Sequence, residues 1–215
     1  MYIYEKEIIE KDEKKIIDMY DRGFVLTRKD VGVMQKIRSL RVNINNFNLT
    51  SENRRILRKN DKLLLEVYSL PLDNYDWKIH AMGEKFYSQK FGKNTISANK
   101  IKSIVKDKKT SFNTILKFSI DEDIVGYCIC FLKEEILHYA YPFYDTEYIS
   151  KSLGIGMMTK TLEYAKSKSL KYMYLGSVYK KESLYKLQFE GEEWFFKDKW
   201  NQDISELKDI LRDRK

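Results

Sequence analysis

Residues 138–176 read HYAYPFYDTEYISKSLGIGMMTKTLEYAKSKSLKYMYLG, and this stretch decides the fold. Residues 136–144 form an aromatic and aliphatic run, which is typical of a mostly buried strand, and turn chemistry follows at Asp145. Residues 172–175 predict a second, short strand. Between the strands, one helical stripe is apolar and the opposite face is charged. The apolar stripe consists of Leu153, Met157, Met158, Leu162 and Ala165. The stretch therefore predicts strand, turn, helix and strand.

Two glycines, Gly154 and Gly156, lie in the first turn of this helix. Each lowers helix propensity by roughly 1 kcal/mol, which makes sense where a ligand must approach the backbone closely. Exposed amides at the start of a helix attract phosphate. A tight turn between strand and helix, with no ligand, explains the glycines equally well.

The composition is that of a globular protein with excess positive charge. The chain has 215 residues, 43% apolar and 14% aromatic, which is enough for a substantial core. Its net charge of +8 favours an anionic partner, although a lysine-rich proteome would have the same effect. Cys128 and Cys130 are two residues apart in a strand pattern and so share a face. They cannot form a disulfide scaffold or a metal site alone, and we interpret them as buried reduced thiols.

No part of the sequence indicates a membrane protein. No apolar run approaches transmembrane length. The acidic beginning of the chain, with Glu5, Glu7 and Glu10, is unlike a signal peptide. We therefore expect a cytoplasmic protein with no membrane partner.

The remaining elements predict an α/β fold with a mixed sheet. Residues 63–70 indicate a buried strand, and residues 112–120 and 124–132 indicate a hairpin. Antiparallel neighbours followed by a strand–helix–strand crossover predict a central mixed sheet flanked by helices. We place an N-terminal segment at residues 1–62, packed on a core domain at residues 63–215.

Two basic regions are candidates for binding an anion. Residues 49–60 predict a helix on which Arg54 and Arg58 lie one turn apart, as do Arg55 and Lys59. Arginine forks match phosphate geometry well. Residues 84–109 hold eight lysines against two acidic residues, a local balance of +6. Interleaved aromatic residues make this region typical of single-strand binding, but a solvated face over an aromatic core fits equally well.

Several motifs, taken together, resemble a known family. They are residues 38–42 (RSLRV), 51–60 (SENRRILRKN), 143–147 (FYDTE), 152–154 (SLG), 172–176 (YMYLG) and 184–189 (LYKLQF). In this order they resemble the aminoacyl-tRNA–protein transferases of the arginyl and leucyl N-end-rule type. The resemblance implies a catalytic domain of the Gcn5-related N-acyltransferase (GNAT-like) fold. It also implies transfer of an aminoacyl group from charged tRNA to the N-terminal amine of an acceptor protein.

The resemblance also suggests roles for individual residues. Tyr144 or Tyr185 would handle the proton or donate to the oxyanion, and Asp145 would be catalytic. Asp145 and Glu147 would bind a cationic donor side chain or the acceptor ammonium. Substrate binding would involve Arg54, Arg55, Arg58, Glu147, Lys151, Ser152, Gly154, Gly156 and Lys186. Without the resemblance, the acidic residues would be interpreted as turn caps and the tyrosines as core residues.

The sequence departs from the family at several positions. The paired cysteines that often bind a metal or an iron–sulfur cluster in arginyl members are replaced by Met34 and Ile37, so we expect no metal. The proline after Asp145 is Thr146. The donor ester is already activated, so the reaction needs no cofactor.

Two alternatives remain open at this stage. Lys151, Gly154 and Gly156 nearly fit the pyrophosphate loop of acyl-CoA-dependent GNAT enzymes, which predicts an acetyl-CoA-dependent N-acetyltransferase. An RNA-binding module without catalysis would also keep the fold and the basic surface. The aminoacyltransferase interpretation is preferred because it explains the arginine helix and the segment containing Tyr185 and Lys186, which the acetyl-CoA-dependent interpretation leaves unexplained.

Overall fold

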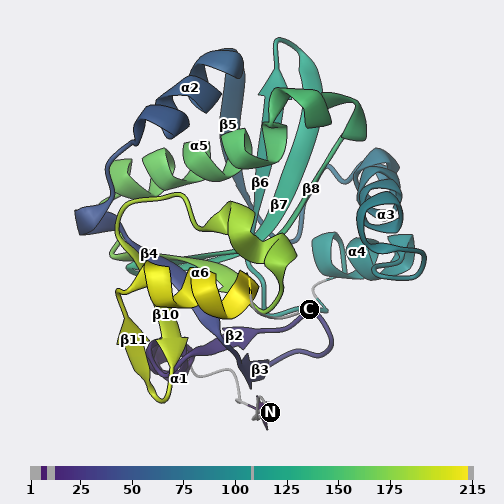
Figure 1. Ribbon diagram of the computed structural model, residues 1–215. Coiled ribbons are helices and arrows are strands. Elements are labelled where there is room, and N and C mark those ends of the chain that lie inside the picture. Colours follow the sequence, from purple (N-terminus) through teal and green to yellow (C-terminus); the bar gives the residue numbers. More distant parts are fainter. Residues whose placement is uncertain (1–5, 9–12, 108, 213–215) are drawn as a thin grey trace.

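The computed structural model describes residues 6–8, 13–107 and 109–212, and it is built on an eight-stranded sheet with the order β11-β10-β4-β9-β8-β7-β6-β5 (Figure 1). A small second sheet has the order β1-β3-β2. The strands are β1 Lys6–Ile8, β2 Phe24–Leu26, β3 Val33–Lys36, β4 Ser39–Asn43, β5 Leu63–Ser69, β6 Thr114–Ile120, β7 Asp123–Lys133, β8 Ile136–Tyr144, β9 Tyr172–Ser177, β10 Glu192–Phe196 and β11 Lys199–Asn201. The α-helices are α1 Glu13–Asp21, α2 Ser51–Lys59, α3 Trp77–Phe91, α4 Ala98–Val105, α5 Leu153–Ser167 and α6 Ile204–Arg212. Short 3-10 helices are η1 Ile44–Asn46, η2 Thr146–Lys151 and η3 Lys181–Lys186.

The sheet is mixed because β8 and β9, which flank α5 in sequence, pair in parallel, whereas the other pairings described are antiparallel. The parallel pairing joins only residues 136–138 to residues 172–174. Beyond it, β8 continues to Tyr144 beside β7, and β9 continues to Ser177 beside β4. The register between β7 and β8 shifts between Ile129 and Cys130 of β7. Ala140 of β8 has no partner there and is the extra residue, as at a β-bulge. The two central strands therefore diverge, and polar backbone groups along the divergence need other partners.

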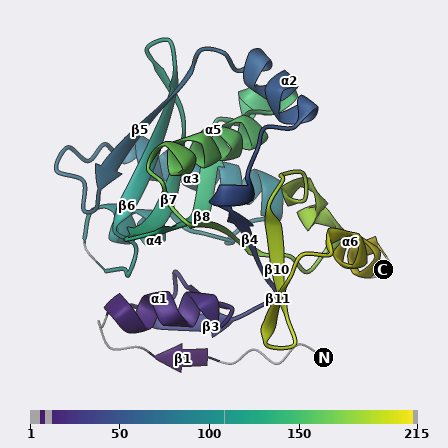
Figure 2. The ribbon, with the colours of Figure 1, turned by 90° about the vertical axis from the view of Figure 1, so that its left-hand side faces the viewer.

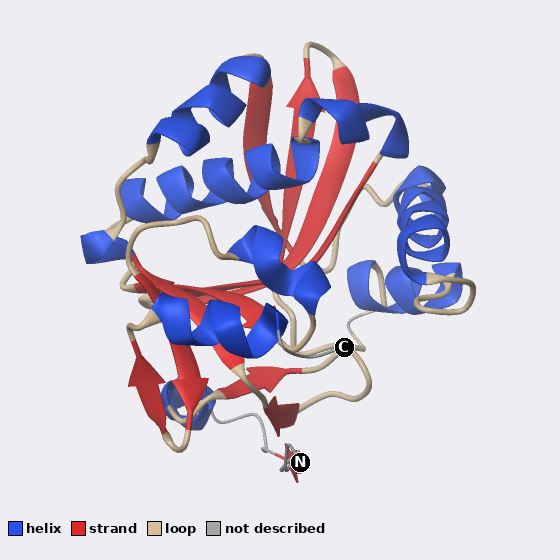
Figure 3. Cartoon of the chain, viewed as in Figure 1, coloured by secondary structure: helices blue, strands red, loops and turns tan. Residues whose placement is uncertain are grey.

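Helices lie on both sides of the sheet, which confirms the predicted α/β class with a central mixed sheet flanked by helices. Figure 3 shows α2 and α5 on one side of β8 and the α3–α4 pair on the other. The expected apolar stripe of α5 is buried, including Leu153, Met157 and Leu162. Helix α2 begins with the capping box of Thr50 and Asn53, and it packs alongside α5.

Strand β4 precedes the boundary that we expected near residue 62, and it pairs with β9 and β10, which both follow that boundary. In the sheet order β4 lies between these two strands, and Figure 2 shows it beside β10. The division into residues 1–62 and 63–215 stays a prediction. No described helix is long and apolar enough to cross a membrane.

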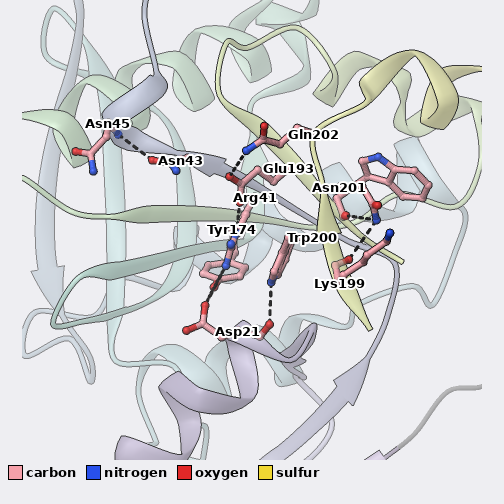
Figure 4. Close-up of polar contacts among 11 residues, drawn as sticks. Asp21, Arg41, Asn43, Asn45, Tyr174, Glu193, Lys199, Trp200, Asn201 and Gln202 are labelled. Carbon is pink, nitrogen blue, oxygen red and sulfur yellow. Dashed lines mark hydrogen bonds and ion pairs between the residues drawn. The ribbon is translucent and has the colours of Figure 1, made fainter. Parts of the chain in front are cut away.

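A buried arginine ties the N-terminal helix to the lower part of the sheet (Figure 4). Arg41 of β4 forms ion pairs with Glu193 at 2.8 Å and Asp21 at 2.9 Å. Its guanidinium carbon lies 3.6 Å from the ring centre of Tyr172 and 3.9 Å from that of Trp200. The RSLRV motif therefore places this arginine in a structural network.

Candidate functional site

A cavity of about 520 Å³ opens where β8 and β9 diverge. Its walls come from the C-terminal half of α3, the distal half of β8, the first turn of α5 and the segment that contains η3. The lining residues are mostly aromatic or apolar, as in pockets that enclose a small group. Of the residues predicted for the site, the lining includes Tyr144, Ser152, Gly154, Tyr185 and Lys186. The structure thus brings together five predicted residues from a stretch of sequence that runs from Tyr144 to Lys186.

Tyr144 explains the first glycine of α5. A Cβ atom at Gly154 would lie 2.9 Å from the ring of Tyr144, so a larger residue would displace the ring. The Tyr144 hydroxyl accepts a hydrogen bond from Lys90 Nζ at 3.2 Å. Because this hydroxyl accepts from Lys90, its own proton remains available to a bound group.

The second glycine of α5 is covered by the protein itself. A Cβ atom at Gly156 would lie 3.1 Å from the side-chain amide of Asn60, which follows α2. The residue before the helix, Ser152, has left-handed backbone geometry with φ of 57° and no side-chain cap. The absence of a side chain at Gly156 is therefore explained by the packing of Asn60, at the end of α2, against the first turn of α5.

All the charged residues in the described cavity lining are cations: Arg28, Lys90 and Lys186. Arg28 donates to the carbonyl oxygen of Thr95 at 3.0 Å, and its guanidinium lies over Tyr141. Lys90 lines the cavity and is exposed to solvent. A bound group that is anionic, or that becomes anionic during a reaction, is favoured in this field.

Lys186 occupies the gap between the diverging strands. Its ammonium donates to the carbonyl oxygens of Leu175 at 2.8 Å and Ser177 at 3.1 Å, on the part of β9 that β8 no longer pairs. An ammonium has three donors, so one N–H remains for a group in the cavity. Burial lowers the pKa of Lys186 to about 8. Behind it, burial and then the charge of Lys186 lower the pKa of His138 to about 3, so this histidine is neutral.

Tyr185 lies at the rim, with 44% of its surface exposed. Desolvation of its hydroxyl raises its pKa to about 12, so near neutral pH the group is protonated and can donate a hydrogen bond. Lys90 lies 5.9 Å from the centre of its ring.

The predicted acidic residues follow β8 but lie outside the described cavity lining. Asp145 accepts a hydrogen bond through Oδ1 from the backbone N–H of Glu147 at 3.1 Å, and it thereby caps η2. Glu147 is exposed. The catalytic role of Asp145 and the binding role of Glu147 stay predictions. Among the described residues, no three His, Cys, Asp or Glu side chains converge as a metal site requires.

The arginines of α2 are exposed and lie apart from the cavity lining. Arg55 forms an ion pair with Glu52, and Arg54 donates to the carbonyl oxygen of Leu49, both at 2.5 Å. Arg58 projects from the same helix. The side chain of Lys151 lies outside the described part of the structure, so its predicted role is untested. A role for this surface in binding tRNA likewise stays a prediction.

Sequence reasoning missed Arg28 and Tyr139, which also line the cavity. Arg28 follows a short strand far from every motif, and no pattern of the sequence links it to β8. Tyr139 was counted as part of the buried strand. Its position next to the end of the parallel pairing could be recognised only from the register.

Comparison with known proteins places this geometry in a family. Residues 70–196 match the family model described as "Arginine-tRNA-protein transferase, C terminus". The chain belongs to this family. The match covers more than half of the chain and includes the cavity walls formed by α3, β8, α5 and η3.

Individual relatives are more distant. An aspartate/glutamate leucyltransferase of Campylobacter jejuni is 28% identical over 148 residues, which is 66% of this chain and 61% of the relative. The enzyme of the same name from Acinetobacter baylyi is 22% identical over 178 residues, which is 81% of this chain and 64% of the relative. The chain thus spans less than two thirds of the length of these relatives. The structure of L-PGS from Bacillus licheniformis shares the fold, with a TM-score of 0.51 at 11% identity over 82% of this chain and 53% of that one.

Proposed function

We propose that the protein transfers an aminoacyl group from aminoacyl-tRNA to the α-amine of an acceptor protein. The observation that carries this proposal is the cationic, mostly apolar cavity at the divergence of β8 and β9, in a chain of the arginine-tRNA-protein transferase family. Such a cavity can enclose one amino-acid residue and exclude water from its ester. Because aminoacyl-tRNA is the donor, we place the reaction in the cytoplasm.

The charges of the cavity favour an uncharged donor residue, such as leucine, over arginine. An arginine side chain would meet three cations and, among the described lining residues, no carboxylate. The same cations would attract an acceptor whose first residue is aspartate or glutamate. The names of the curated relatives agree with this pairing of a leucyl donor with an acidic acceptor.

The proposed chemistry needs positioning, an oxyanion partner and a route for one proton. The neutral acceptor amine attacks the ester carbonyl, the new C–N bond forms and the C–O bond to the ribose breaks. The free N–H of Lys186 stabilises the developing oxyanion. The proton leaves the amine and is delivered to the ribose oxygen, with the hydroxyl of Tyr144 or Tyr185 as the relay. The donor ester is already activated, so the step requires no cofactor.

An acetyl-CoA-dependent reaction has less support from the geometry. A pyrophosphate bound at the first turn of α5 would have to approach Gly156, where the side chain of Asn60 already packs.

We propose that the tRNA is held by exposed cations of α2 and of residues 84–109. Each neutralised phosphate adds to the salt dependence of binding, so we expect tRNA affinity to fall steeply between low and physiological salt.

The first prediction is that the protein labels a peptide that begins with aspartate when it is supplied with radioactive leucyl-tRNA. The same peptide with an acetylated N-terminus should stay unlabelled, because its amine cannot attack. Arginyl-tRNA should give little label for the electrostatic reason given above. Acetyl-CoA should not raise the melting temperature, whereas a true ligand at 100 times its dissociation constant would stabilise the fold by about 2.7 kcal/mol.

The outcomes separate the parts of the proposal. Transfer from arginyl-tRNA but not from leucyl-tRNA would overturn the donor class and keep the reaction. Acetylation of the peptide from acetyl-CoA, with no transfer from either tRNA, would overturn the reaction itself.

A further inference from the structure

Tyr139 brings to the cavity wall a buried hydroxyl that lacks a hydrogen-bond partner in the described part of the protein. The side chain is 2% exposed, and its hydroxyl has no hydrogen-bond partner among the residues that the structure describes. Leaving a buried hydroxyl unpaired is unfavourable, and native structures rarely do so without a reason. Phenylalanine would fill the same space without this penalty.

Other tyrosines of the same cavity differ from Tyr139 in this respect. Tyr87 donates to the carbonyl oxygen of Pro142 at 3.0 Å, Tyr141 accepts from the backbone of Arg28 at 3.1 Å, and Tyr144 accepts from Lys90. Tyr185 reaches solvent at the rim. Tyr139 lines the cavity, and its unpaired hydroxyl is buried in the wall against which a bound group would pack.

The position of Tyr139 suggests which group this is. It is the first residue of β8 after the parallel pairing with β9 ends, so it stands where the two strands begin to diverge. Lys186 bonds to β9 along the same divergence. Burial raises the pKa of Tyr139, so its hydroxyl keeps its proton and acts as a donor. The cavity field disfavours a cationic partner, which leaves an uncharged or partly negative acceptor atom.

We propose that Tyr139 is a substrate-binding residue whose hydroxyl donates a hydrogen bond to the aminoacyl group of the donor. The inference rests on the proposed function, since it assumes that this group enters the cavity. This hydrogen bond is made to the aminoacyl group itself. It would therefore let the protein discriminate between aminoacylated tRNA and tRNA that carries no amino acid. The acceptor atom is the ester carbonyl oxygen or the neutral α-amine.

The test measures binding to Tyr139→Phe with an analogue that cannot react. The probe is adenosine that carries leucine through an amide at its 3′ position, and plain adenosine is the reference. We expect the variant to bind the leucylated probe about three- to tenfold more weakly and to bind adenosine unchanged, since one neutral hydrogen bond is lost. Equal affinity of variant and wild type for the leucylated probe would overturn the proposal and leave water as the partner of the hydroxyl.

A second measurement distinguishes a binding role from a structural one. Without ligand, Tyr139→Phe should melt at the same temperature as the wild type or higher, because an unpaired buried hydroxyl is removed. Tyr174→Phe on β9 is the matched control, because its hydroxyl contacts Arg41 at 3.3 Å and Asp21 at 3.4 Å. The control should melt lower and keep its affinity for the probe. A similar drop in melting temperature for Tyr139→Phe would show that its hydroxyl has a structural partner, which would overturn the inference.

Failure of the inference is distinguishable from failure of the proposed function. If the wild type binds the leucylated probe and transfers leucine, and Tyr139→Phe does both equally well, only the inference fails. If the wild type neither binds the probe nor transfers leucine, the proposed function fails, and the inference fails with it.

Discussion

Replacing Lys186 with methionine should reduce the rate of aminoacyl transfer by about a hundred- to a thousandfold, the usual effect of removing one oxyanion donor. The ammonium of Lys186 is fixed by two carbonyl oxygens of β9, and Lys186 lines the cavity. An ammonium has three donors, so the third N–H remains for a bound group. A donor that is already held in place need not reorganise when negative charge develops on the ester. Single-turnover transfer from leucyl-tRNA measures the effect on the chemical step.

The dependence of the rate on pH gives a control for this prediction. The rate should rise as the acceptor α-amine loses its proton, near its ordinary pKa of about 8. It should fall again as Lys186, whose pKa is about 8, loses its own proton, so the wild type should have its maximum near pH 8. In Lys186→Arg the cation persists at every accessible pH, so the fall on the alkaline side should disappear even though the rate is lower. An unchanged alkaline fall in this variant would exclude Lys186 as its source.

The central part of the fold could be predicted because its pattern is local. The strand at residues 136–144 and the buried stripe of α5 both follow from side-chain periodicity alone. Strands β3 and β11 were missed because three or four residues carry too little periodicity to be recognised. The strand predicted at residues 63–70 is confirmed as β5 (Leu63–Ser69), but the prediction that this strand is buried was wrong. β5 is the last strand of the sheet, and Leu64 is 58% exposed although its neighbour Leu63 is buried.

Less of the candidate site than of the fold could be predicted from the sequence. Tyr144, Tyr185 and Lys186 were predicted from family motifs, and the structure places them around one cavity. The glycines of α5 were also noticed, but their neighbours Tyr144 and Asn60 depend on how β8 and α2 pack against the helix. Such contacts between distant segments are set by tertiary packing, for which a single sequence gives no local signal.

The second large effect is expected on stability: Arg41→Met should lower the free energy of unfolding by about 3 kcal/mol or more, because it leaves a buried carboxylate without its cation. The side chains of Arg41 and Glu193 are 7% and 8% exposed, so water cannot replace the lost partner. Lysine at position 41 should restore only part of the stability, since it cannot bond both carboxylates through a planar fork or stack between Tyr172 and Trp200 in the same way.

Urea denaturation of matched variants tests whether burial is the cause. Arg55→Ala breaks an ion pair in which both side chains are about half exposed, and it should leave the unfolding transition almost unchanged. Adding Glu193→Gln to Arg41→Met removes the stranded charge, so the double variant should be more stable than the sum of the two single effects predicts. If the two losses simply add, or if Arg55→Ala costs as much as Arg41→Met, the network does not depend on a buried ion pair. The stacking of Arg41 on Tyr172 and Trp200 would then be its main contribution to stability.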